Sequence, residues 1–474
     1  METLHNIIDN LQDFLWTYIN IGLLIGCAIY FTVRTRFIQF RLLGDMVRQM
    51  FSSGKSAGRH GGDGQAEKGK KPISSFQAFI VALASRIGTG NLAGVATAIS
   101  VGGPGAIFWM WVMALFGAAT AFVESTLAQL YKRKGKGSYH GGPAYYMRHG
   151  LHRKWMGILF SILIIITFGF ANNAMQSNTI ALACEQAFNI PLTVMGVLLS
   201  ALTVAIIFGG IHRIARVSSA LVPVMAVAYL VIAVWVVITH ISIIPDIMRM
   251  IVSEAFGAGQ FAGGTLGTVV MIGVKRGLFS NEAGEGSAPN AAATATVSHP
   301  VKQGLIQALG VFTDTLVVCS CTAFVILCSG VDFTAADGIQ LTQNAMTAEI
   351  GGAGNTIIAI MIWLFAFSTI IANCYYGETN LLYFSRSRIM LFIYRLTAAG
   401  FVMMGALMTL SFAWSMIDLC MAMITICNLA AIIQLYPKVH RLVADYMRQR
   451  REGKDPVFTH KVMPDISPED IEAW

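Results

Sequence analysis

The sequence predicts an all-α, polytopic membrane protein whose core consists of two five-helix repeats in opposite orientation. Hydrophobic residues make up 55% of the 474 residues and charged residues only 12%, about half of the share that is usual in soluble domains. Many apolar segments reach the roughly 20 residues that a helix needs to cross a bilayer. The basic residues collect in every second connection between these segments. These features exclude most classes of soluble enzyme.

Eleven segments are expected to cross the membrane as helices, one of them interrupted. They are residues 14–33, 74–101, 104–130, 155–187, 191–210, 217–240, 246–280 (interrupted), 303–329, 353–383, 390–410 and 414–436. Their order divides the chain into four parts. These are an extra N-terminal helix with a basic loop (1–73), a first five-helix repeat (74–240), a second, inverted repeat (246–436) and a tail (437–474).

The distribution of lysine and arginine predicts the orientation. The connections on one side of the membrane hold 30 of the 33 basic residues. Cytoplasmic loops carry such an excess, so we expect the N-terminus outside and the C-terminal tail in the cytoplasm. The net charge of +8 then reflects topology and not nucleic-acid binding. A basic cluster in the first loop, Lys68, Lys70 and Lys71, is expected to contact anionic lipid headgroups.

The middle of the span 74–101 contains residues that disfavour a continuous helix. Gly88 and Gly90 weaken the helix, and the side chains of Thr89 and Asn91 compete for its backbone hydrogen bonds. An unwound stretch survives in a membrane only where it is buried in protein or lines a cavity, and there it would expose carbonyl and amide groups to a ligand. The alternative is a helix-packing face of the G-x-x-x-G type that starts at Gly90.

A second glycine-rich segment, residues 256–264, separates two apolar halves of the span 246–280. Neither half is long enough to cross alone, so we expect an interrupted span; an ordinary extracellular loop is the alternative. The two interruptions lie in the first spans of the two repeats. Paired broken helices in inverted halves indicate the binding site of a secondary transporter.

Four short strings carry a resemblance to a known family. They are Gly88–Ala96 (GTGNLAGVA), Gly102–Trp111 (GGPGAIFWMW), Phe279–Gly284 (FSNEAG) and Gly286–Asn290 (GSAPN). These strings resemble the signatures of the alanine/glycine:cation symporter family, the sodium:alanine symporters, and the similarity covers nearly the whole chain. The resemblance implies a LeuT-type fold with one extra N-terminal helix, sodium coupling, alanine or glycine as substrate, and a place in the cytoplasmic membrane.

A zwitterionic amino acid brings a carboxylate and an ammonium, and a broken helix offers a complementary end for each. Gln176 can donate and accept at once, and the resemblance also supports a substrate-contacting glutamine on its span. Hydrogen bonding between helices is the alternative role for the polar residues 172–178. Phe256 or Phe261 would cap the substrate methyl group, with simple packing as the alternative. The predicted substrate site consists of Gly88, Thr89, Gly90, Asn91, Gln176 and Phe256.

The LeuT-type arrangement also implies a sodium site between the first core helix and the eighth, which here is the span 353–383. That span carries the adjacent hydroxyls of Ser368 and Thr369. A hydroxyl in an apolar helix otherwise bonds back to the carbonyl four residues earlier. The predicted sodium ligands are the two hydroxyls and three carbonyls, from Ala84, Ile87, Phe365, Ser368 and Thr369. Asn91 lies at the spacing of a second sodium ligand.

We therefore expect a transporter, not an enzyme, that imports alanine or glycine with sodium by alternating access. A proton-coupled symporter with Glu124 as the titrating group is the alternative within transport. A membrane-embedded enzyme would need a base or metal ligand at depth, yet all ten histidines lie outside the cores of the apolar segments. A channel would favour one repeated pore loop over two unlike broken helices.

Charged residues inside the spans need partners. Arg86 and Glu124 are expected to form an internal pair or a cytoplasmic gate. Glu282 and Glu285 are expected at the cytoplasmic mouth, where they would gate the path or cap the next helix.

The eight cysteines are expected to be buried, reduced thiols, and the basic tail is expected to be solvated.

Overall fold

The computed structural model describes residues 2–56, 73–135, 139–257, 266–385 and 387–474. Within these ranges the chain is almost entirely helical, and the strands β1 (Arg133–Lys134) and β2 (Tyr139–His140) form a short antiparallel pair. The lysines of the first loop, Lys68, Lys70 and Lys71, lie outside the described residues. All eight cysteines are free thiols, and seven of them are buried.

The helices follow the order of the predicted spans, with several of them divided. The N-terminal part and the first half contain α1 (Glu2–Leu15), α2 (Ile21–Arg34), α3 (Ile38–Arg41), α4 (Leu43–Ser56), α5 (Ser75–Arg86), α6 (Val95–Gly102), α7 (Gly105–Leu130), α8 (Pro143–His149), α9 (Lys154–Ile164), α10 (Asn172–Phe188), α11 (Leu192–Ile207) and α12 (Gly210–Thr239). The second half contains α13 (Ile244–Ala255), α14 (Leu266–Asn281), α15 (Ala288–Ala292), α16 (Pro300–Val311), α17 (Ser320–Cys328), α18 (Gly338–Ile350), α19 (Ala353–Phe384), α20 (Arg388–Leu407) and α21 (Leu410–Arg451).

Four π-helical stretches join some of these helices into longer ones. They are η1 (Trp16–Asn20), η2 (Gly90–Gly94), η3 (Ile165–Ala171) and η4 (Phe312–Cys319), and a 3-10 turn, η5 (His460–Val462), lies in the tail. Stretches of this kind are often found at functional sites because they disturb the regular backbone ladder. Here η2, η3 and η4 lie in the predicted first, third and seventh core helices.

Eight helices among the described residues are long and apolar enough to cross a membrane, and a bent pair makes a ninth. Two of the eleven predicted spans are not among these nine. The span 191–210 corresponds to α11, which has only 16 residues, and the span 246–280 corresponds to α13 and α14, between which residues 258–265 lie outside the described part. The multi-pass architecture is confirmed, and the count of eleven stays a prediction.

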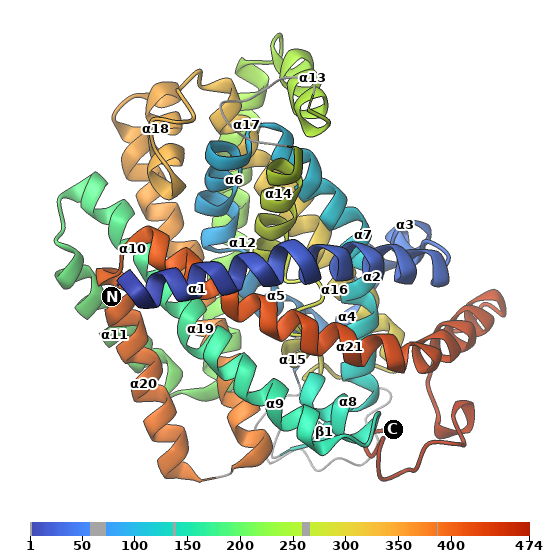
Figure 1. Cartoon of the computed structure of the whole chain (residues 1–474). Coiled ribbons are helices and arrows are strands. Elements are labelled where there is room, and N and C mark those ends of the chain that lie inside the picture. The colour runs from blue at the N-terminus through green and yellow to red at the C-terminus, as the bar shows by residue number, and fades with distance from the viewer. Residues whose placement is uncertain (1, 57–72, 136–138, 258–265, 386) are drawn as a thin grey trace.

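The extra N-terminal helix crosses the outside of the bundle. In Figure 1 the dark blue α1 and α2 lie across the other helices, where α1 contacts α21 and α2 contacts α7. The indole N–H of the fully buried Trp16 donates to the carbonyl of Asp418, 2.9 Å away. At one end of the molecule lie α13 and α18, and at the other lie α8, β1 and the C-terminus (Figure 1).

The first core helix is broken where the sequence predicts it. α5 begins at a capping box formed by Ser74 and Gln77, and it ends at Arg86 because Ile87 has extended backbone (φ −77°, ψ 90°). The chain then resumes as η2 and α6, bent by 49° from α5. α5 contacts α12, α16 and α19, and η2 contacts α14 and α18. The break is therefore enclosed by protein, as an unwound segment at membrane depth must be.

Candidate functional site

The residues predicted to bind sodium lie together at the end of α5. The Thr369 hydroxyl lies 2.8 Å from the carbonyl oxygen of Ala84, 3.2 Å from that of Ile87 and 3.1 Å from that of Phe365. The neighbouring Ser368 hydroxyl donates to the same Phe365 carbonyl at 2.8 Å. All five residues are buried. The Thr369 hydroxyl thus lies beside three backbone carbonyls, and the Ser368 hydroxyl shares one of these carbonyls with it. We refer to these three carbonyls and two hydroxyls as the oxygen cage.

Gln176 bridges the break to the third core helix. Its side-chain carbonyl accepts from the backbone N–H of Thr89 at 2.8 Å, and its amide donates to Asn172 at 2.7 Å. Gly88 is required here, because a Cβ on this residue would overlap the Thr369 hydroxyl and lie 2.7 Å from the Gln176 carbonyl oxygen. The Thr89 N–H stands at the start of the second half-helix, the end that attracts a carboxylate.

Asn91 closes the break on its other side. Its side-chain carbonyl accepts from the backbone N–H of Gly88 at 2.9 Å, and its amide donates to Asp314 at 2.7 Å and Ser280 at 3.2 Å. The Ser280 hydroxyl also donates to Asp314, at 2.7 Å. Asp314 is completely buried. Neither Ser280 nor Asp314 was predicted as a site residue, although an acidic residue in a span is itself a signal of function.

A second break, which was not predicted from the sequence, faces the first. α14 ends at Asn281, and the next residues take positive φ at Glu282 (56°), Gly284 (102°) and Gly286 (81°) before α15 begins. The predicted interruption at 256–264 lies almost entirely outside the described residues. The signal for the observed break was the pair of glycines, Gly284 and Gly286, within the strings FSNEAG and GSAPN; this pair lies between the predicted spans 246–280 and 303–329.

The two breaks are in direct contact. A Cβ on Gly90 would lie 3.0 Å from the Cα of Ser280, so only a glycine allows this approach of the two backbones. The Ser85 hydroxyl donates to the Glu282 carboxylate at 2.6 Å. Glu282 and Glu285 are at most 2% exposed, so they lie inside the protein rather than at an open mouth.

The expected ion pair between Arg86 and Glu124 does not form in the described structure. The Arg86 guanidinium donates to the backbone carbonyl of Gln307 at 3.2 Å. Glu124 instead accepts from Asn428 at 2.8 Å and from the backbone N–H of Gly284 at 3.3 Å. Both side chains are buried. Through these hydrogen bonds, Glu124 contacts the second break, and Arg86 links the end of the first half-helix to Gln307.

Aromatic rings cover the break from the side of α14. A Cβ on Gly90 would lie 3.1 Å from the Phe279 ring, which meets the Trp414 ring edge-on at a centroid distance of 4.9 Å. The Arg276 guanidinium lies 3.8 Å above the Trp414 ring and forms an ion pair with Asp418. Sequence reasoning missed this cover because its residues come from separate helices.

The predicted cap residue Phe256 occupies a different environment from the other predicted site residues. It is 58% exposed, and its ring contacts Phe108 and Trp109 at centroid distances of 5.2 and 6.1 Å. The other five predicted substrate residues are buried at the break. The alternative candidate, Phe261, lies outside the described residues.

Comparison with known proteins places these residues in a transporter context. A family model described as the sodium:alanine symporter family matches residues 1–460. The chain is 46% identical over 474 residues to the probable sodium/glutamine symporter GlnT of Bacillus subtilis, covering 100% of this chain and 96% of that protein. It is 47% identical to the amino-acid carrier protein AlsT of Bacillus subtilis (100% and 98% covered) and 38% identical to the sodium/proton-dependent alanine carrier protein of Bacillus sp. strain PS3 (81% and 91% covered).

Solved structures with low sequence identity share the fold. A sodium-coupled sialic acid symporter matches with a TM-score of 0.52 at 14% identity, covering 97% of both chains. The transporter MhsT in complex with L-phenylalanine matches with a TM-score of 0.51 at 12% identity, covering 80% of this chain and 89% of that chain. These proteins have the LeuT-type fold, so the predicted fold class is confirmed.

Proposed function

Since the chain belongs to the sodium:alanine symporter family, we propose that it imports alanine and glycine together with sodium ions. The chain is a multi-pass cell-membrane transporter, not an enzyme, and it couples amino-acid transport to a cation. Its choice of amino acid and of cation is what the proposal adds. The observation that carries the proposal is that the oxygen cage and the N-terminal end of the second half-helix share one break, at Ile87–Thr89.

Sodium is the proposed coupling ion because the cage offers neutral oxygens only. The ligands are the carbonyls of Ala84, Ile87 and Phe365 with the hydroxyls of Ser368 and Thr369. When the ion enters, these hydroxyls turn their lone pairs toward it. One elementary charge that moves through 100 mV provides about 2.3 kcal/mol, enough for roughly fiftyfold accumulation of substrate.

Alanine and glycine are the proposed substrates because the space around the half-helix end is small. We propose that the substrate carboxylate takes the Thr89 N–H, to which the Gln176 carbonyl now bonds. Gln176 then turns its polar end toward the substrate. We propose that the rings of Phe279 and Trp414 bound the substrate space beside Gly90, and we expect them to oppose a branched side chain.

We also propose the orientation and the repeats that the charge distribution predicts. The N-terminus lies outside, the tail after residue 436 lies in the cytoplasm, and the repeats 74–240 and 246–436 are inverted. The two breaks that meet at Gly90 and Ser280 support this division, because inverted repeats bring corresponding broken helices together at the middle of the membrane.

Proton coupling is the second candidate, and Asp314 is the residue that favours it. Its buried carboxylate accepts from Asn91 on the first broken helix and from Ser280 on the second, so a proton on Asp314 would act on both. The carrier of Bacillus sp. strain PS3 is named for sodium and protons alike. Asp314 is a stronger candidate than Glu124, which contacts only the second break.

Uptake into proteoliposomes tests the proposal. The purified chain is reconstituted, and uptake of labelled alanine is measured with an imposed gradient of sodium, lithium or protons. We expect uptake with the sodium gradient, inhibition by excess unlabelled glycine, and no inhibition by leucine or glutamine at the same concentration. Uptake driven by protons alone and lost in Asp314→Asn would replace sodium by the second candidate. Equal inhibition by glutamine would show that the pocket is larger than proposed.

A further inference from the structure

The last 20 residues of the chain fold back onto the end of α7. The indole N–H of Trp474 donates to the carbonyl of Gln129 at 3.0 Å. The Glu472 carboxylate accepts from the backbone N–H of Lys134 at 2.8 Å and from the Arg133 guanidinium at 3.0 Å. The Lys132 ammonium lies 4.6 Å from the centre of the Trp474 ring. This end of the tail is therefore held by backbone, charge and ring contacts together.

The beginning of the same segment binds the start of α16. The backbone N–H of Phe458 donates to the carbonyl of Ser298 at 2.8 Å, and the Ser298 hydroxyl donates to the carbonyl of Pro456 at 3.0 Å. Lys302 in the first turn of α16 forms an ion pair with Asp455 at 2.5 Å. The segment thus spans from the loop after α7 to the loop before α16.

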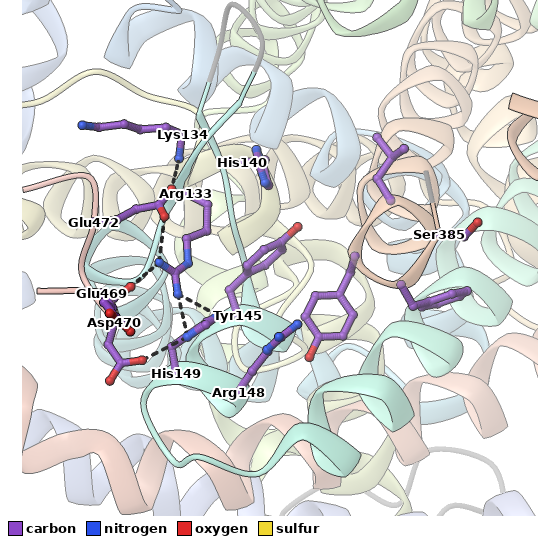
Figure 2. A pocket seen from close by; sticks show the side chains of 13 residues that line it. Arg133, Lys134, His140, Tyr145, Arg148, His149, Ser385, Glu469, Asp470 and Glu472 are labelled. Atoms are coloured by element: carbon purple, nitrogen blue, oxygen red, sulfur yellow. Dashed lines mark hydrogen bonds and ion pairs between the residues drawn. The ribbon is translucent and has the colours of Figure 1, made fainter. Parts of the chain in front are cut away.

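A third group of contacts reaches the end of α8. Asp470 accepts from His149 at 3.0 Å, and Figure 2 shows Glu469, Asp470 and Glu472 gathered beside Arg133 and His149. These side chains form one edge of a cavity of about 530 Å³, whose other edge is the end of α19 at Ser385 (Figure 2). The segment is also anchored by buried apolar side chains, Phe458, Met463, Ile466 and Ile471.

The helices that this segment joins lead to both breaks and to the helix that carries Thr369. α7 and α16 pack against each other. α7 holds the second break through Glu124, and η4, which continues α16, holds the first break through Asp314. α8 leads into α9, which contacts α19, the helix that carries Thr369. Under the proposed alternating access, we expect a path from the breaks toward this end of the molecule to open by separation of these helices at their ends.

We propose that residues 455–474 form a cytoplasmic clasp, which holds the ends of α7, α16 and α8 together and must release before the site opens to the cytoplasm. The clasp sets the rate of substrate release, because conformational opening rather than binding limits many cycles of this kind. The proposal rests on the proposed transport function and adds a regulatory element to it. Its acidic residues make it sensitive to changes of charge on Arg133 and Lys134.

A reversible cross-link tests the clasp. Lys134→Cys and Glu472→Cys are introduced together, and a cleavable bifunctional thiol reagent joins them. We expect uptake of labelled alanine to fall by about tenfold in the cross-linked protein and to recover when dithiothreitol cleaves the link. The eight native cysteines stay in place, since seven are buried and Cys321 is half-buried. The matched control joins Glu452→Cys to Lys454→Cys, an exposed pair within the tail that bridges no other helix.

A charge exchange gives a second, independent reading. Glu472→Arg alone loosens the clasp and is expected to raise the rate of alanine exit about twofold, and Arg133→Glu added to it restores the pairing and the original rate. The clasp proposal would be overturned by full uptake in the cross-linked protein, or by an exit rate of alanine that is the same in both charge variants as in the wild type. A wild-type chain that takes up no amino acid would instead overturn the proposed function and the clasp with it.

Discussion

The Thr369 hydroxyl makes both of the contacts that were predicted as alternatives, the bond within its own helix and the contact with the first core helix. Its hydroxyl reaches the carbonyl of Phe365, four residues earlier in α19, as a threonine in an apolar helix usually does. The same hydroxyl also reaches the carbonyls of Ala84 and Ile87 across the helix interface. Back-bonding and the proposed ion binding are therefore compatible, because a hydroxyl can turn its hydrogen away and direct a lone pair to a cation among the same carbonyls.

Removal of both hydroxyls is expected to weaken sodium binding. In Ser368→Ala with Thr369→Ala, the sodium concentration for half-maximal alanine uptake should rise about tenfold or more, since each bond to a charged group contributes roughly 1.5–3 kcal/mol. The control is Thr203→Ala, a buried hydroxyl that bonds only within α11. An unchanged sodium dependence in a double variant that still transports would exclude this cage.

Gln176→Ala is expected to weaken substrate binding and to leave sodium binding intact. The variant removes the side chain that is proposed to turn its polar end toward the substrate, and leaving a buried polar group of the bound substrate unpaired costs about 1–3 kcal/mol. The half-saturation for alanine should therefore rise, while sodium binding measured without substrate should not change. Gln343→Ala, a buried glutamine on α18 bonded to Ala183, is the matched control. If the alanine half-saturation stayed at the wild-type value, the residues 172–178 would serve only to join helices.

At the level of the helices, the break after Arg86 could be predicted from the sequence, and the break at residues 282–286 could not. Gly88 and Gly90 interrupt an otherwise apolar span, so a local pattern reveals the first break. Gly284 and Gly286 lie among charged and polar residues, so the same pattern looks like an aqueous loop. Its burial and the contact of Glu282 with Ser85, far away in sequence, show that this segment is inside the protein. The positions of Asp314, Phe279 and Trp414 also depend on packing between helices that no local pattern encodes.

The second break is expected to depend on its glycines. Gly286 has φ 81°, and a Cβ there would lie 2.7 Å from Pro143 and 2.9 Å from Phe160, so Gly286→Ala should abolish alanine uptake in a protein that still inserts. Gly351→Ala separates strain from crowding, since Gly351 has φ 72° with no atom within 4 Å. This control should lose stability and keep its uptake. Normal uptake by Gly286→Ala would show that this segment is an ordinary connection.

For the molecule as a whole, the sequence was sufficient to predict the family, the helical class and the LeuT-type fold. The helical membrane class follows from composition and charge distribution, which depend on the membrane and not on any particular contact. The family and the LeuT-type fold follow from the four strings that resemble the family's signatures. The number of spans could not be fixed in the same way, because α11 has 16 residues and is shorter than the roughly 20-residue helix that crosses a bilayer. The contacts of the tail were not predictable either, since basic residues near a terminus usually indicate a solvated end.

The buried ammonium beneath the tail is expected to make stability depend on pH. Burial lowers the pKa of Lys132 from 10.5 to about 7, so between these values unfolding takes up a proton. The contribution of Lys132 to the free energy of unfolding therefore rises with pH from about 7 to 10.5 and is lost below this range. Lys132→Met should flatten this part of the curve of melting temperature against pH, measured in detergent. The exposed Lys454→Met is the control, and an equal flattening there would contradict the assignment.

The contact between the two breaks also limits how this gene can be recombined. Gly90 meets the backbone of Ser280, Asn91 bonds to Ser280, and Ser85 bonds to Glu282. A chimera that takes its first half from one relative and its second half from another therefore combines a first break and a second break from different parents, at a contact where the two backbones are tightly packed. Crossovers between the halves will be tolerated where both parents carry matching strings at 88–96 and 279–290. In a shuffled library, these two strings should be recovered together from the same parent.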